Sequence, residues 1–157
     1  MKFPSLSQLK KDLSFLNEQE LVELIAELSK FSRDNKAYLF FKLHEKDNPG
    51  LFLEMAKEEL ELEFQKANTQ HGYYAKKSAQ AIRRKMNKLL KLNKKKEDQA
   101  ELILFFYERL KEYGYLAHRH PVIQHLYEIQ IRKAEKLISG LHEDLQYDFQ
   151  EKMRELA

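Results

Sequence analysis

The sequence has no cysteine and is poor in glycine and proline, and each shortage narrows the folds and the chemistry open to the chain. Without cysteine, disulfides, thiolate nucleophiles and cysteine metal ligands are excluded. Only four glycines and three prolines occur in 157 residues. A β protein needs turn residues about every eight to twelve positions, so the scarcity of turn residues favours helices.

Long hydrophobic runs are also missing. The longest is residues 102–107, far below the roughly twenty residues that span a bilayer. Residues 1–12 carry charges where a signal peptide requires an apolar run. We therefore expect a soluble, cytoplasmic protein with no membrane partner.

The residues that are present suit one globular domain. A chain of this length is the size of a single domain that can bury its own core. Hydrophobic residues make up 43% and charged residues 34%, a balance typical of folded rather than disordered chains. Ten phenylalanines and eight tyrosines supply bulky core side chains. We expect a single domain over residues 1–157.

Apolar residues recur at three- and four-residue spacing along most of the chain, which predicts about eight helices. Asn17, with Glu20 three residues later, is expected to cap the second helix, and Asp34 or Asn35 the third. The four glycines fall at the expected breaks. The clearest segments are 51–68, 74–92, 97–113, 121–139 and the C-terminal stretch.

Two apolar patterns refine this expectation. In the second helix, an apolar stripe consists of Leu21, Leu24, Ile25, Leu28 and Phe31. The run 102–107 is apolar on every side and by itself could form a strand, but its charged and helix-forming flanks favour a helix. Such a helix is expected to be buried all round.

Short links make consecutive helices antiparallel neighbours, so helical hairpins are expected. The predicted fold class is therefore all-α. The hairpins could form an irregular helical bundle or a short α-solenoid-like stack, and no fixed-period repeat decides between them.

Charge is distributed unevenly along the chain. Residues 73–96 hold ten Lys and Arg and no Asp or Glu. Residues 1–72 hold ten basic against thirteen acidic residues, and residues 97–157 hold eight against twelve. A mildly acidic chain thus contains one concentrated cationic segment.

The cationic segment 74–96 is predicted to form an amphipathic helix over roughly residues 74–92, followed by a polar connection at residues 93–96. Its apolar side would be Ala75, Ala79, Ile82, Met86, Leu89 and Leu90. The candidate polyanion-binding residues on its other sides are Lys76, Lys77, Arg83, Arg84, Lys88, Lys91, Lys94 and Lys95. Such a ridge could bind phosphates of a nucleic acid. Alternatively, it is a solvated face that glutamates of segment 51–68 neutralise.

A second candidate lies around the loop histidines. His118, His120 and His125, with Glu128 nearby, offer donors for a zinc or other divalent metal. Their spacing matches no established metal motif. The alternative is a polar loop whose histidines bond to the backbone at a helix start.

No catalytic or cofactor motif is present. The glycines are isolated, so no phosphate-cradling loop exists, and there is no Gly-x-Ser-x-Gly elbow. Glu59 and Glu63 share a helix face, but exposed helical glutamates are commonplace. These absences favour a non-enzymatic module without a cofactor.

Residues 13–28 and 35–43 resemble an uncharacterised bacterial family of small helical domains, whose members have a leucine-rich capped helix followed by a short helix ending in Phe-Lys-Leu. Residues 101–107 are similar to that family's central buried helix. The resemblance implies an all-helical domain of bacterial origin. It implies no catalytic residues, because the family's function is unknown.

Apolar surface on nearly every helix, without a catalytic signature, favours a module that binds another protein or itself. The alternative is binding of nucleic acid or another polyanion through residues 74–96, and a further one is a metal-dependent activity around the three histidines.

Overall fold

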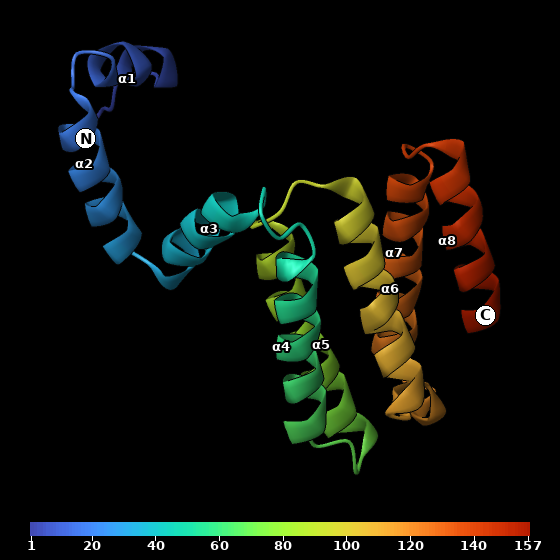
Figure 1. Ribbon diagram of the computed structural model, residues 1–157. Coiled ribbons are helices and arrows are strands. Elements are labelled where there is room, and N and C mark those ends of the chain that lie inside the picture. The colour runs from blue at the N-terminus through green and yellow to red at the C-terminus, as the bar shows by residue number, and fades with distance from the viewer.

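The computed structural model describes residues 1–157 and contains eight α-helices, one 3₁₀ helix and no strand (Figure 1). The all-α prediction is confirmed. The elements are α1 (Leu6–Leu13), α2 (Glu18–Lys30), α3 (Arg33–His44), α4 (Leu51–Lys66), α5 (Gly72–Leu90), α6 (Lys96–Glu112), η1 (Tyr115–His118), α7 (Pro121–Ile138) and α8 (Glu143–Leu156).

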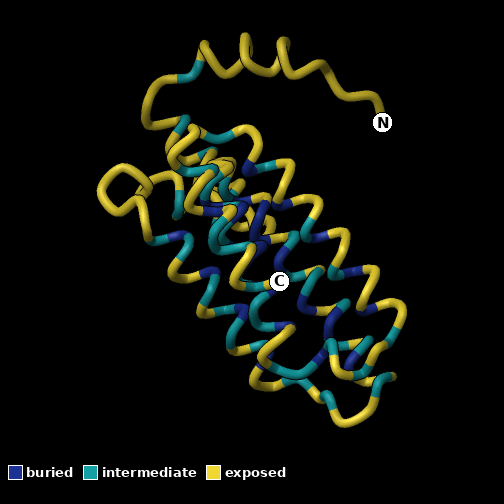
Figure 2. Tube along the Cα trace, turned by 90° about the vertical axis from the view of Figure 1, so that its right-hand side faces the viewer, coloured by how far each residue is buried: buried dark blue, intermediate teal, exposed yellow.

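The helices divide into a packed body and an N-terminal part that projects from it. All 26 buried residues lie between Phe52 and Phe149, and α1, α2 and α3 contribute none. Figure 1 shows α1 and α2 standing away from the body, and Figure 2 shows the N-terminal segment almost wholly exposed. The buried core therefore lies within the part of the chain from α4 to α8, and α3 adds only the partly buried Ala37 and Phe41 at its edge.

Helix α6 is the centre of the body. It packs against α4, α5, α7 and α8. Leu102, Ile103, Leu104 and Phe106 are each 0% exposed. The apolar run forms a helix, as expected, but the expected burial on every side is only partly correct, because Phe105 lies on a half-buried face together with Glu101 and Arg109.

Aromatic side chains fill one end of the core. The Phe64 ring lies 5.4 Å from the ring of Tyr113, 5.7 Å from that of Phe106 and 5.8 Å from that of Tyr115. The Tyr115 hydroxyl is buried and lies 3.0 Å from Ser78 Oγ. This contact satisfies a polar group inside the core and joins η1 to α5.

The predicted caps of α2 and α3 have different outcomes. Asn17 caps α2 as expected, because its Oδ1 accepts from Glu20 N–H at 2.9 Å. The cap predicted for α3 is wrong: Ser32 Oγ accepts from Asn35 N–H at 3.0 Å. The Asn35 side chain instead donates to the carbonyl of Leu28 at 2.9 Å.

Helix α5 ends at Leu90, two residues before the predicted end at residue 92. The polar connection predicted at residues 93–96 is present, except that Lys96 already begins α6. Gln99 Nε2 donates to the carbonyls of Leu90 and Asn93 at 2.9 and 2.8 Å, which satisfies groups left free at the helix end. Lys94 and Lys95 consequently lie in the link to α6.

Most of the apolar stripe of α2 is left in solvent. Phe31 is 82% exposed, Leu28 52% and Ile25 45%. Only two residues separate α2 from α3. The Ser32 cap and the Asn35–Leu28 bond fix the angle between these helices, and that angle directs α2 away from the body (Figure 1).

Candidate functional site

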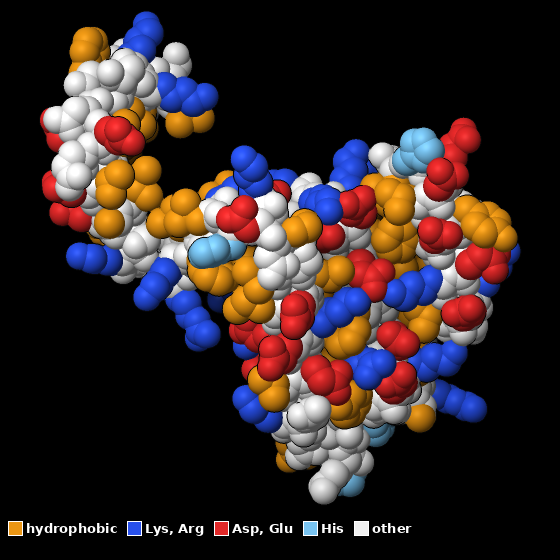
Figure 3. All heavy atoms as spheres, viewed as in Figure 1, with side chains coloured by type: hydrophobic (Ala, Val, Ile, Leu, Met, Phe, Trp, Pro, Cys, Tyr) orange, Lys and Arg blue, Asp and Glu red, His pale blue; other side chains and the backbone are white.

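The N-terminal arm, defined as residues 1–32, carries an exposed apolar surface. Its exposed large hydrophobic side chains are Met1, Phe3, Leu6, Leu9, Leu13, Phe15, Val22, Ile25, Leu28 and Phe31. Figure 3 shows hydrophobic side chains along the arm with no body helix over them. Scattered apolar residues are normal on a surface, but a continuous set on two amphipathic helices marks an interaction surface.

The second helix of the arm is also acidic. It contains four glutamates and a single lysine, namely Glu18, Glu20, Glu23, Glu27 and Lys30. None of these five side chains makes an ion pair within the chain; the ion pairs begin at Lys42. Helix α2 therefore presents an apolar stripe beside unpaired negative charge.

The basic segment, residues 73–96, is mostly unpaired. Only Lys85 and Lys95 make ion pairs, Lys85 with Glu59 and Glu63 at 2.8 and 3.1 Å and Lys95 with two acidic residues at the start of α6. A hydrogen bond to Glu59 is the main cause that raises the pKa of Lys85. Helix α4 thus neutralises only Lys85 and leaves the other basic side chains of the segment without a partner on α4.

The structure places the predicted polyanion-binding residues in two groups. Lys76, Lys77, Arg83, Arg84 and Lys88 lie on α5, opposite or beside a buried side made of the six apolar residues that the sequence indicated. Lys91 ends the helix, and Lys94 and Lys95 follow in the link.

Positive charge continues from α5 onto α7, which the sequence did not indicate. Lys133 Nζ donates to Asn87 Oδ1 at 3.4 Å. Burial lowers the pKa of Lys133, and the neighbouring Arg83 lowers it further. The buried Nε of Arg83 has no hydrogen-bond acceptor. Lys133 joins the ridge only because α7 packs beside α5.

Two tyrosines lie at the start of the ridge. Tyr73 and Tyr74 are about half exposed, with ring centroids 5.5 Å apart. The ammonium groups of Lys77 and Lys76 lie 4.5 and 5.4 Å from the Tyr73 ring centroid. A hydrogen bond with Lys77 lowers the pKa of Tyr73. Both rings remain accessible for stacking.

A groove separates α3 from α4 and α5. It consists of two adjoining hollows of about 430 and 380 Å³, which share lining residues from all three helices and from Leu92. The apolar lining includes Phe40, Phe41, Met55 and Leu89, and the cationic lining includes Arg33, Lys36, Arg84 and Lys88. The two acidic lining residues are Glu59, which pairs with Lys85, and Asp34.

The structure does not bring the three candidate histidines together as a metal site. No group of three or more His, Asp or Glu side chains is arranged to hold a metal ion. His120 instead caps α7, where its Nδ1 accepts from Val122 N–H at 3.2 Å. His118 lies in η1 and His125 is exposed on α7.

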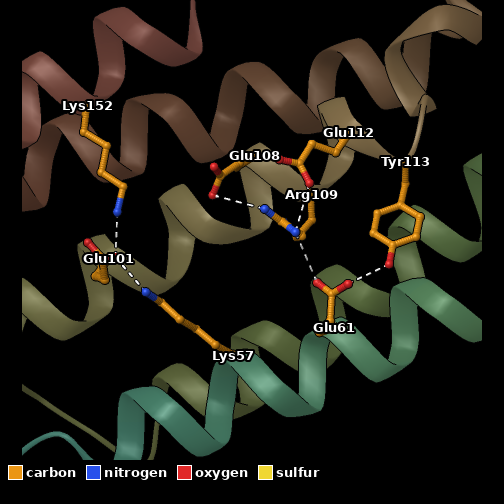
Figure 4. Close-up of polar contacts among 8 residues, drawn as sticks. All are labelled: Lys57, Glu61, Glu101, Glu108, Arg109, Glu112, Tyr113 and Lys152. Atoms are coloured by element: carbon orange, nitrogen blue, oxygen red, sulfur yellow. Dashed lines mark hydrogen bonds and ion pairs between the residues drawn. The ribbon is translucent and has the colours of Figure 1, made fainter.

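The half-buried glutamates connect helices rather than form acid–base pairs (Figure 4). Glu101 Oε1 accepts from Lys152 at 2.6 Å and from Lys57 at 2.7 Å, which joins α6 to α8 and α4. Glu61 Oε1 accepts from the Tyr113 hydroxyl at 2.6 Å, and its other oxygen lies 3.6 Å from Arg109. The charges in this view are compensated.

Asp98 is the one buried carboxylate of the chain, and it lies beside a small cavity of about 130 Å³. Burial raises the pKa of Asp98, whereas a 2.8 Å hydrogen bond from Asn93 Nδ2 opposes this effect. The same asparagine accepts from Lys95 N–H at 2.8 Å. The contacts of Asp98 therefore stabilise the turn between α5 and α6.

Comparison of the chain with protein-family models, with curated proteins and with solved structures finds no match. The resemblance of the N-terminal third to a bacterial helical family consequently supports no functional conclusion. No helix combines the length and the apolar character that crossing a membrane requires.

Proposed function

We propose that the protein is a helical module that binds another protein through its N-terminal arm. The observation that carries this proposal is the pair of amphipathic helices α1 and α2, which bury no residue and expose their apolar side chains. A surface of this kind is stabilised when a partner removes it from water.

The arm is ordered as helices without help from the body, which suits a docking element. Ser5 caps α1 and Asn17 caps α2 through side-chain hydrogen bonds. The apolar positions Leu21, Leu24, Ile25 and Leu28 follow the i, i+3, i+4, i+7 spacing of a helix that binds in a groove. Such an arm loses less conformational freedom on binding than a disordered segment.

Site-specific photo-crosslinking tests this proposal. A photoreactive amino acid replaces Ile25 in the full chain, and the protein is irradiated in lysate of the cells that produce it. We expect discrete covalent protein adducts, because Ile25 lies on the exposed stripe of α2. The matched control carries the same probe at Gln124, an exposed position on α7. Equal adduct yields at the two positions would contradict the proposal.

A second candidate function is binding of nucleic acid or another polyanion through the basic segment. The observation that favours it is that eight of its ten basic side chains have no ion pair, while Lys133 of α7 adds charge next to Arg83. Unpaired cations along one surface release counterions from a phosphate backbone when they bind it.

Titration of a labelled single-stranded oligonucleotide at several salt concentrations tests the second candidate. We expect affinity to fall with salt, and each phosphate contact removed should reduce the slope of log affinity against log salt by about 0.7 for a single strand. Arg83→Ala with Lys91→Ala should therefore reduce the slope by about 1.4. Lys46→Ala with Lys136→Ala, two exposed lysines without ion pairs, is the control. Binding that is absent at low salt would remove this candidate.

A further inference from the structure

The groove between α3, α4 and α5 has the shape and charge that receive an acidic amphipathic helix. Its apolar lining includes Phe40, Met55 and Leu89. Arg33, Lys36, Arg84 and Lys88 line it with positive charge, and none of them makes an ion pair within the chain. A helix that fills this groove would bury apolar side chains and bring its acidic residues to these cations.

The chain itself contains a helix with these properties. Along α2, the exposed Ile25 and Leu28 belong to the apolar stripe. At 100° per residue, Glu18 and Glu27 lie along the two edges of that stripe, and neither has an ion-pair partner in the chain. Thirteen residues of helix are about 20 Å long. The arm and the groove therefore complement each other in polarity and in charge.

The arm of a chain is held away from that chain's own groove. Arg33 lines the groove directly after the link between α2 and α3. The Ser32 cap of α3 and the 2.9 Å bond from Asn35 Nδ2 to the Leu28 carbonyl keep α2 pointing outward. Figure 1 shows the arm separate from the body. Folding α2 back would break the bond from Asn35 to Leu28, which joins the two helices.

We propose that the partner of the arm is a second copy of this chain, whose groove receives α2, so that two copies exchange arms. This inference rests on the proposed function and names its partner. A two-fold arrangement satisfies both grooves with both arms, and exchange of an identical element is a low-cost route to a dimer. The cations of the groove then face the glutamates of α2.

The inference is tested by reversing charges on the arm and in the groove. Sedimentation velocity over a range of concentrations measures the dimerisation of each variant. The natural chain is expected to dimerise, more weakly at high salt because charged contacts are screened. Arm-reversed Glu18→Lys/Glu27→Lys and groove-reversed Arg84→Glu/Lys88→Glu should each weaken dimerisation roughly tenfold or more, since like charges then meet. An equimolar mixture of the two variants should form a heterodimer, because opposite charges face each other again.

The control reverses two exposed lysines that line neither the groove nor the arm, as Lys46→Glu/Lys136→Glu. It should dimerise like the natural chain, and circular dichroism should give the same helix content for all four proteins. A natural chain that stays monomeric at every concentration would overturn the inference. The inference would also be overturned if the arm-reversed and groove-reversed variants dimerise like the natural chain. The same holds if these variants lose oligonucleotide binding but keep their dimerisation.

The crosslinking experiment separates this inference from the proposed function. An adduct from position 25 with twice the mass of the chain, joined to a groove residue by mass spectrometry, supports the second copy. Adducts that contain only other proteins overturn the second copy and leave the proposed function standing. Adducts no more abundant than at the control position contradict both.

Discussion

At the scale of single residues, the body depends on a few half-buried ion pairs between helices. Glu101 accepts two lysines from different helices on one oxygen. Burial raises the pKa of Glu101, but the hydrogen bonds from Lys152 and Lys57 outweigh this effect and leave the pKa below its ordinary value. Its ionised form therefore stabilises the folded state.

Glu101→Gln is expected to reduce the free energy of unfolding by about 1–3 kcal/mol at neutral pH, because two charged hydrogen bonds are lost. Since the pKa is lowered on folding, the stabilisation is complete above the unfolded value of about 4.3. It is lost as the pH falls through the folded value. Urea unfolding from neutral to acid pH should show the difference from the natural chain shrinking below about pH 4. Glu155→Gln, an exposed control on α8, should change stability by less than about 0.5 kcal/mol.

Replacing glycine by alanine is expected to have opposite effects on stability at two positions. Gly114 has φ of 77°, where an L side chain is strained even though nothing lies within 4 Å of the added Cβ. Gly114→Ala should destabilise the protein by about 1 kcal/mol. Gly72 begins α5, and its added Cβ would lie at an ordinary 3.7 Å from His120. Gly72→Ala should stabilise by roughly 0.4–1 kcal/mol. Thermal unfolding that moves in the same direction for both variants would contradict this account.

At the scale of elements, similar apolar periodicity has two different outcomes. The apolar residues of α6 are enclosed by four neighbouring helices. Those of α2 are left in solvent, because the short link and the bond from Asn35 to Leu28 direct the helix outward. Periodicity shows that a helix has an apolar face but not what covers that face.

A matched pair of substitutions measures this contrast. Ile103→Ala in α6 should reduce the free energy of unfolding by about 2–5 kcal/mol, because it leaves a cavity in the core. Ile25→Ala in α2 should change it by no more than about 0.5 kcal/mol when the protein is dilute enough to keep copies apart. Denaturant unfolding gives both values. A loss at Ile25 as large as that at Ile103 would show that the arm packs on its own body.

At the scale of the whole molecule, stability is expected to differ between the arm and the body. Backbone amides in the centre of α6 should exchange hydrogen only on global unfolding, since this helix packs against four others. Amides of α1 and α2 should exchange orders of magnitude faster in dilute protein, because local fraying exposes them. Hydrogen-exchange mass spectrometry measures both. Equal protection of α2 and α6 in dilute protein would contradict this division.

Much of the fold was predictable because its signals are local. The cap at Asn17, the breaks at the glycines and the buried side of α5 depend on residues within one or two turns of each other. The cap of α3 was not predictable, because Ser32, Asp34 and Asn35 are all residues that can cap a helix. Ser32 makes the cap, and the Asn35 side chain instead donates to the carbonyl of Leu28, seven positions earlier.

The candidate site was predictable only as a charge pattern. Ten basic residues without an acidic one were visible in the sequence, but their ion pairing was not. Glu59 and Glu63 neutralise only Lys85, and Lys133 joins the ridge from a helix more than forty residues away. Neither fact follows from spacing along the chain, because both depend on how helices pack.

The sequence by itself determined that this chain is helical, where most helices begin and end, and that one run is apolar enough for a core centre. These features arise from backbone preferences and from the helical repeat, which act over a few residues. Only the tertiary structure decided which apolar faces are covered. The angle at Ser32 leaves α2 exposed and opens the groove beside α3, and such an angle is set by contacts between elements rather than within them.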